Sequence, residues 1–224
     1  MSHASNIVTE QLTRAGQAIE HDSFAIVDRE AGPHGYRADE WPLVRRMIHA
    51  SADFDFNGLT RFHPQAISAG LQAIRVGRPI VADVEMIVAG LSRPRLAHFG
   101  VTTHHFISDA DVIAAAQAQQ TTRAVQAMRK AHAAGLIDGG IIAVGNAPTA
   151  LLEVLRLIRE EAVRPALIIG MPVGFVSAAE SKAELAELAD IPWITIHGRK
   201  GGSPLVVAAI HALLALAEKP EIQL

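Results

Sequence analysis

The chain has 224 residues, of which 50% are hydrophobic and 4% aromatic, and its formal net charge at pH 7 is -3. This length is enough for one well-cored α/β domain with a helical extension. The small negative charge, without a basic block, argues against nucleic-acid binding, and the lack of cysteine excludes disulfides, thiolate-bound zinc and thiol nucleophiles. No apolar run is long enough for a membrane span and no signal-peptide pattern opens the chain, so we expect a cytoplasmic protein without membrane partners.

The first 78 residues predict a helical N-terminal layer. Ser5 is suited to cap the first helix, and Pro64 is suited to the first turn of the third, where no amide partner is lost. The three expected helices cover about residues 5–20, 39–52 and 64–77.

Five short runs, most of them rich in Ile and Val, then predict strands that are buried on both faces. They cover residues 79–84, 99–106, 140–145, 166–170 and 193–196. Helical runs follow or separate them, at residues 85–91, 109–119, 121–134, 150–160, 177–188 and 204–216. This alternation predicts a single α/β domain over residues 1–224, with a mostly parallel, five-stranded, Rossmann-like sheet flanked by helices and residues 1–78 as its helical N-terminal layer.

Each of the last three strands is followed by a turn rich in glycine or proline, at residues 146–149, 171–175 and 197–203. Because ligands of parallel sheets bind beyond the carboxyl ends of the strands, we expect the active site at this edge. Such turns can bind an anion through backbone amides, although each alone can equally be a tight connection. The candidate ligand-binding residues in and after these turns are Asn146, Gly174, Ser181, Lys182 and Arg199.

Nucleotide-binding signatures are absent from these turns. No Gly-x-Gly-x-x-Gly follows a strand, and in the segment 198–203 the lysine precedes the glycine pair, whereas in a phosphate loop it follows the glycine. A nucleotide-dependent α/β enzyme is therefore disfavoured.

His49 is the most informative single residue. On the second expected helix Arg46 lies three residues before it and Asp53 four residues after it, so the three side chains should share a face. Flanking charges of both signs would tune the pKa of the imidazole near neutrality, as proton transfer requires. From spacing alone, a solvated charge cluster is the more common explanation.

Two other pairs of polar residues invite functional interpretations. His104 and His105 are adjacent on an expected strand and so point to opposite faces, which argues against a shared metal ion; we expect no protein-bound metal. Asp83 and Glu85 bracket the end of a strand, where either catalysis or helix capping would explain them.

Three longer segments, at residues 145–151, 170–182 and 197–203, resemble the signature of the precorrin-8X methylmutases, a family that includes the cobalt-precorrin-8 methylmutases of the anaerobic cobalamin pathway. The likeness extends to residues 23–26 and 44–49 and so covers nearly the whole chain. The segment 170–182 is long and chemically unusual, which makes the resemblance far more specific than a glycine spacing.

The resemblance implies an α/β homodimer with a corrinoid bound near the subunit interface, and an isomerase that moves a methyl group from C-11 to C-12 of precorrin-8 or cobalt-precorrin-8, giving hydrogenobyrinate or cobyrinate. It implies no cofactor, since any cobalt belongs to the substrate; segment 51–56 resembles the cobalt branch more. The family's catalytic histidine matches His49, and its substrate-contacting serine and two arginines match Ser23, Arg46 and Arg123. The alternative is a carrier that binds the tetrapyrrole without rearranging it.

Overall fold

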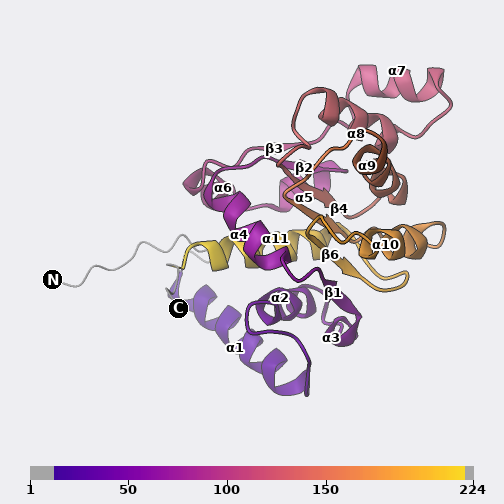
Figure 1. The fold of residues 1–224 in the computed structure, drawn as a ribbon. Coiled ribbons are helices and arrows are strands. Elements are labelled where there is room, and N and C mark those ends of the chain that lie inside the picture. The colour runs from indigo at the N-terminus through magenta and orange to yellow at the C-terminus, as the bar shows by residue number, and fades with distance from the viewer. Residues whose placement is uncertain (1–12, 220–224) are drawn as a thin grey trace.

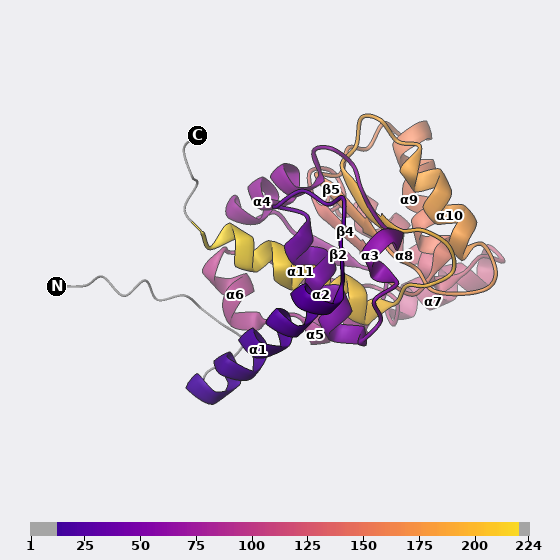
Figure 2. The same cartoon turned by 90° about the horizontal axis from the view of Figure 1, so that it is seen from below.

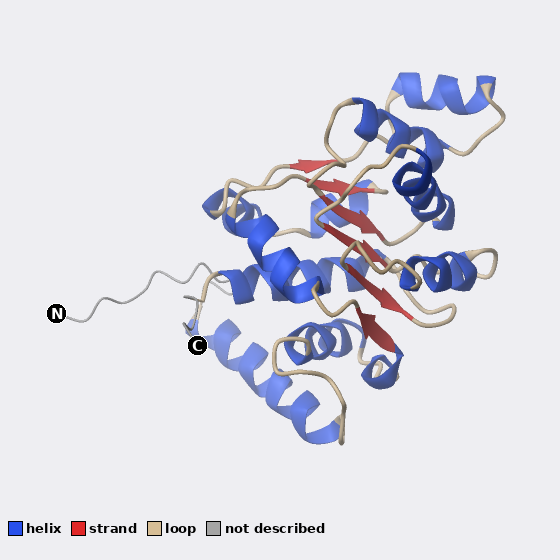
Figure 3. Cartoon of the chain, viewed as in Figure 1, coloured by secondary structure: helices blue, strands red, loops and turns tan. Residues whose placement is uncertain are grey.

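A six-stranded sheet runs through the centre of the computed structural model, which describes residues 13–219 (Figures 1 and 3). Its strands are β1 (Thr60–Phe62), β2 (Ile80–Ala82), β3 (Thr103–His104), β4 (Ile141–Val144), β5 (Leu167–Gly170) and β6 (Trp193–Ile196). Their order is β1-β6-β5-β4-β2-β3, and every neighbouring pair is parallel except β1 with β6. All residues of β4, β5 and β6 are buried, as expected for strands covered on both faces.

The prediction of a mostly parallel α/β sheet is confirmed, but the number of strands is six, whereas the sequence predicts five. The missed strand is β1, whose three residues include one exposed arginine and form no apolar run. It pairs antiparallel with β6 at the edge of the sheet, where a short and polar strand is tolerated. At the other edge β3 has only two residues, fewer than the expected segment 99–106.

Helices cover both faces of the sheet (Figure 1). One face is covered by α11 (Ser203–Ala217), which packs against α2 (Trp41–Ser51), α4 (Ala66–Arg75) and α5 (Glu85–Gly90). The other face is covered by α8 (Arg123–Ala133), α9 (Pro148–Glu160) and α10 (Ala178–Ala186), with α7 (Ala110–Ala118) packed against α8. The short helices α3 (Phe56–Leu59) and α6 (Arg93–His98) complete the described chain.

The central helix of the first face is α11. Ten of its 15 residues are buried, and it is apolar nearly all round, which is typical of a helix enclosed by neighbours. Gly90 allows α5 to approach it, because a Cβ atom at this position would lie 2.9 Å from the Val207 side chain. No helix among residues 13–219 is long and apolar enough to span a bilayer.

The first described helix differs most from its prediction. Helix α1 (Arg14–Glu30) begins after Thr13, whose side chain accepts a hydrogen bond from the Gly16 amide, and it continues past residue 20. The expected cap, Ser5, lies outside the described residues. Of the 17 residues of α1 only Val27 is buried, and the helix lies on the outside of the domain against α2 (Figure 2).

Candidate active site

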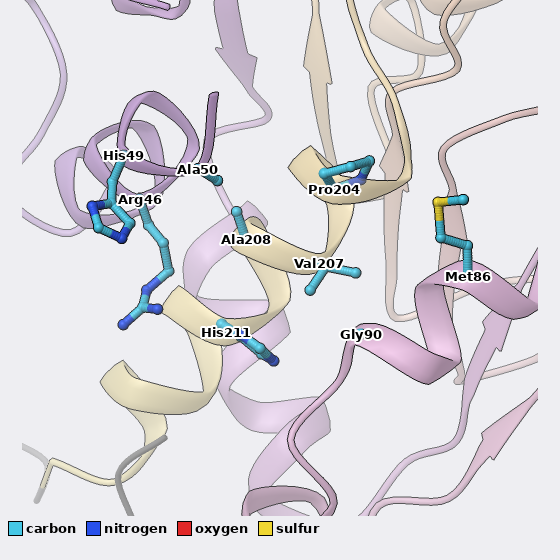
Figure 4. A pocket seen from close by; sticks show the side chains of 9 residues that line it. All are labelled: Arg46, His49, Ala50, Met86, Gly90, Pro204, Val207, Ala208 and His211. Atoms are coloured by element: carbon cyan, nitrogen blue, oxygen red, sulfur yellow. The ribbon is translucent and has the colours of Figure 1, made fainter. Parts of the chain in front are cut away.

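Two adjoining pockets form a groove along the N-terminal half of α11. The first, of about 340 Å³, lies between α2, α5 and α11 (Figure 4), and the second, of about 380 Å³, reaches the turns that follow β5 and β6. The two pockets share Ala50 and Pro204. The groove is lined by Arg46, His49, Ala50, Met86, Gly90, Pro204, Val207, Ala208 and His211 in the first pocket, and by Ser51, Asp53, Phe56, Val173, Lys200, Gly201 and Leu205 in the second.

The floor of the first pocket is apolar at Val207 and Ala208, and its polar groups are Arg46 and His49 on the α2 side and His211 further along α11. In Figure 4, His49 and Arg46 extend from α2 on one side of α11, Met86 stands on α5 on the other, and Val207 and Ala208 lie between them. A trough of this kind suits a flat, largely apolar ligand with polar substituents at its edge.

His49 is held by α1. The Ser23 hydroxyl oxygen lies 2.7 Å from His49 Nδ1, and the Phe24 ring meets the imidazole edge-on at 5.1 Å between centroids. The serine hydroxyl donates to Nδ1 when the imidazole proton is on Nε2, and accepts when the proton is on Nδ1. The ring orientation is therefore fixed in either tautomer, while the imidazole remains solvent-exposed beside the groove.

Arg46 completes this cluster. Its Nη2 donates to Glu20 Oε1 at 3.0 Å, and its guanidinium lies 5.3 Å from the centroid of the Phe24 ring. The structure thus brings Ser23, Arg46 and His49 together. This depends on the continuation of α1 beyond residue 20, which the sequence does not predict.

The expected alignment of Asp53 with His49 is wrong. Helix α2 ends at Ser51, and Ala52 adopts a left-handed conformation with φ 53°, so the chain turns away before residue 53. The Asp53 carboxylate instead accepts a hydrogen bond from Lys200 in the second pocket. Spacing on an unbroken helix was the sole basis of the prediction, and the helix stops too early.

The turns after β5 and β6 are joined to each other. The Gly202 amide donates to the Met171 carbonyl at 2.9 Å, and the Gly174 amide donates to the Arg199 carbonyl at 3.3 Å. A Cβ atom at residue 201 would lie 2.3 Å from the Met171 carbonyl oxygen, so only glycine fits there. Gly174 and Arg199 therefore lie beside the groove, and the Arg199 guanidinium is 5.7 Å from the centroid of the exposed Phe175 ring.

The turn after β4 is filled by the protein's own carboxylate. Asp83, which is fully buried, accepts hydrogen bonds from the amides of Gly145, Asn146 and Ala147 at 3.0, 2.9 and 2.7 Å. Burial raises the pKa of the Asp83 carboxyl, and the three amides oppose that rise. Asp83 thus holds the turn between β4 and α9. Because these amides are occupied, the predicted anion site does not form at the β4–α9 turn, and the Asn146 side chain is exposed outside the groove.

Three further predicted residues lie away from the groove. The Ser181 hydroxyl is buried and donates to the Ala178 carbonyl at 3.2 Å. Lys182 is only 2% exposed, its Nζ donates to the Lys200 carbonyl, and it lines a separate pocket of about 300 Å³ beside β6. Arg123 begins α8, on the opposite face of the sheet from α2 and α11 (Figure 1).

Lys182 gives a testable pH dependence. Burial lowers the pKa of Lys182 from 10.5 to about 8. Between these values the unfolded chain binds the lysine proton and the folded chain does not, so the contribution of Lys182 to the free energy of unfolding rises with pH. We expect urea denaturation to show wild type gaining stability relative to Lys182→Met between about pH 7 and about pH 9.5. A difference that is constant or falls over this range would contradict a desolvated lysine.

Sequence reasoning missed His211, whose Nε2 accepts a hydrogen bond from the Ser92 amide at 3.1 Å. In the sequence it is one polar residue in an apolar helix. Its position seven residues after Pro204 places it on the same helical face as Pro204, Val207 and Ala208, and this spacing is the signal that could have identified it. Among residues 13–219, no group of three or more His, Asp or Glu side chains is placed to hold a metal ion.

Comparison with known proteins identifies the family. Residues 18–216 match the family model described as precorrin-8X methylmutase. A cobalt-precorrin-8 methylmutase of Leptospira interrogans is 52% identical over 93% of this chain and 97% of its own, and one of Priestia megaterium is 51% identical over 92% and 91%. A crystal structure titled as the precorrin-8X methylmutase of Thermus thermophilus superposes with a TM-score of 0.83 at 52% identity, over 89% of this chain and 97% of its own. This chain therefore belongs to the precorrin-8X methylmutase family of methyl-shifting isomerases in cobalamin biosynthesis.

Proposed function

We propose that this chain moves a methyl group from C-11 to C-12 of cobalt-precorrin-8, or of its metal-free form, in the groove beside His49. The observation that carries the proposal is the cluster of Ser23, Arg46 and His49 at the wall of an apolar trough, in a chain of this family. We place the protein in the cytoplasm.

The groove can supply what this rearrangement requires. The apolar floor of Val207 and Ala208 suits one face of the macrocycle, and the cations Arg46 and Lys200 suit carboxylates at its edge. The methyl group moves within one molecule, as the C-11 bond breaks and the C-12 bond forms, so the reaction consumes no methyl donor and no redox cofactor. We propose that His49, with Nδ1 fixed by Ser23, uses Nε2 to place a proton on the conjugated ring or to withhold it.

The test is incubation of the purified protein with precorrin-8 in cobalt and metal-free forms, followed by absorbance. We expect the spectral change of rearrangement, faster with the cobalt form, because the relatives of Leptospira and Priestia are named for that substrate. A bound-pigment spectrum without rearrangement would favour a tetrapyrrole carrier. No spectral change with either form would refute the proposal.

We further propose that the active enzyme is a homodimer and that Arg123 reaches the substrate from the second subunit. Arg123 lies on the opposite face of the sheet from His49, and the two residues line different pockets. Helix α1, which positions His49, has 16 of its 17 residues outside the buried core. A second subunit packed against α1 could bring its own Arg123 to the groove beside His49 of the first subunit.

Subunit mixing tests this arrangement. We expect His49→Ala and Arg123→Ala each to be nearly inactive, and a mixed sample, dissociated and reassembled, to regain about a quarter of wild-type activity. Half of the dimers in a statistical mixture are hybrids, and each hybrid would contain one intact site. Reassembled wild type controls for losses during mixing. Absence of any activity in hybrid dimers purified through a different affinity tag on each variant would place Arg123 outside a shared site.

A further inference from the structure

Lys200 holds two carboxylates at the edge of the second pocket. Its Nζ lies 2.5 Å from Asp53 Oδ2 and 2.7 Å from Asp55 Oδ2, and 5.8 Å from the centroid of the Phe56 ring. We refer to Lys200, Asp53 and Asp55 as the Lys200 cluster. Both Lys200 and Asp53 line the groove, and the Lys200 side chain is 43% exposed, so a ligand in the second pocket can reach it.

The backbone on the lysine side of this cluster is fixed. The Lys200 carbonyl accepts a hydrogen bond from the buried Lys182, and Gly201 packs against the carbonyl of Met171 without space for a Cβ atom. The Lys200 ammonium therefore changes partner by rotation of its own side chain, with no movement of the turn. Asp55 is the more exposed of the two acids, at 68% of its side chain, and is the easier partner to exchange.

The charges of the cluster do not balance. Hydrogen bonds with Asp53 and Asp55 raise the pKa of Lys200, and the hydrogen bond from Lys200 lowers the pKa of Asp53, so these groups are charged at neutral pH. One cation is thus shared between two anions, and the cluster has a net charge of -1. An ammonium has three N–H donors and the two aspartates take two of them, so a carboxylate that enters the second pocket must share Lys200 with both aspartates or replace one of them.

Arg46 at the other end of the groove has a similar arrangement, since it is paired with Glu20. Both cations that line the groove are therefore held by carboxylates of the protein itself. The protein carboxylates keep each cation oriented before a polycarboxylate ligand binds. They also compete with the ligand for the cation, which lowers the affinity.

We propose that Lys200 binds a side-chain carboxylate of the corrinoid and that Asp53 and Asp55 compete with that carboxylate for it. The inference rests on the proposed function, because it requires a polycarboxylate in the groove. The Lys200 cluster then sets both the affinity and the orientation of the macrocycle. The edge of the ligand that enters the second pocket must supply a carboxylate that shares Lys200 with the aspartates or displaces Asp55.

The test measures binding of cobyrinic acid to wild type, Asp55→Asn, Asp53→Asn and Lys200→Met by absorbance titration. We expect each Asn variant to bind about fivefold more tightly, the size of effect typical of one exposed ion pair, and Lys200→Met to bind about tenfold more weakly. In the double variant Lys200→Met/Asp55→Asn the gain should disappear, because the competition acts through the lysine. Thermal unfolding of every variant checks that each is folded.

Two controls separate this inference from a general charge effect. Glu187→Gln removes the same charge from an exposed position at the C-terminal end of α10 and should leave the affinity unchanged. The fully methyl-esterified corrinoid has no free carboxylate and should not distinguish Asp55→Asn from wild type.

The binding measurements also distinguish a failure of this inference from a failure of the proposed function. If wild type binds cobyrinic acid but both Asn variants bind no more tightly than Glu187→Gln, the competition is wrong and the proposed function stands. If wild type binds neither the acid nor the ester, the proposed function itself fails.

Discussion

Replacement of His49 by alanine is expected to lower kcat for the methyl shift by about 10²- to 10⁴-fold, the usual contribution of a positioned acid or base, while corrinoid affinity changes by less than about threefold. The affinity should persist because the apolar floor and the edge cations of the groove are untouched. Single-turnover absorbance measures the rearrangement, and titration with cobyrinic acid measures the binding.

Two further substitutions distinguish proton transfer from packing. His49→Gln keeps much of the side-chain volume and an amide near the position of Nε2 but cannot change its protonation state at neutral pH, so we expect it to be as inactive as alanine. Ser23→Ala removes the hydrogen bond to Nδ1 but leaves the imidazole in place, so we expect a smaller loss of about tenfold and a displaced pH–rate profile. Full activity of His49→Gln would contradict the assignment.

Replacement of Asp83 by alanine is expected to lower the free energy of unfolding by roughly 3 kcal/mol, because three amides in the partly buried turn between β4 and α9 would lose their acceptor. Burial raises the pKa of this carboxyl, so part of the loss is offset by removal of a desolvated acid. Urea denaturation at neutral pH measures the change.

Glu85 provides the matched control for Asp83. It lies two residues further along the chain at the start of α5 and is exposed, so Glu85→Ala should change stability by less than about 0.5 kcal/mol. If the Asp83 and Glu85 variants are equally stable, the carboxylate is not what holds the turn. If Asp83→Ala is folded and stable but inactive, a catalytic explanation of Asp83 would replace its role in holding the turn.

The sequence was sufficient for the parallel core. Strands β4, β5 and β6 are runs of apolar residues whose burial on both faces leaves a clear signature, and Gly201, after β6, is required by its close contact with the backbone of the turn after β5. The edge strand β1 has no such signature, since its three residues become a strand only by pairing with a segment more than 130 residues away.

The site itself depended on packing that no local pattern encodes. The groove exists because small residues, Ala50, Gly90 and Ala208, face one another from three helices distant in the sequence. Asp83 fills the crevice between β2 and β4, where a ligand would otherwise be expected, and the groove instead lies along α11. The resemblance to a family supplied His49, Ser23 and Arg46, whereas helical spacing alone paired His49 with the wrong acid, Asp53.

The most direct test of the account is a crystal structure of this protein with cobyrinic acid bound. We expect the macrocycle to lie over Ala208 and Val207, with His49 Nε2 within hydrogen-bond distance of the ring or of its substituents near C-11 and C-12. A corrinoid bound outside the groove, or an imidazole that faces bulk water in the complex, would contradict the account.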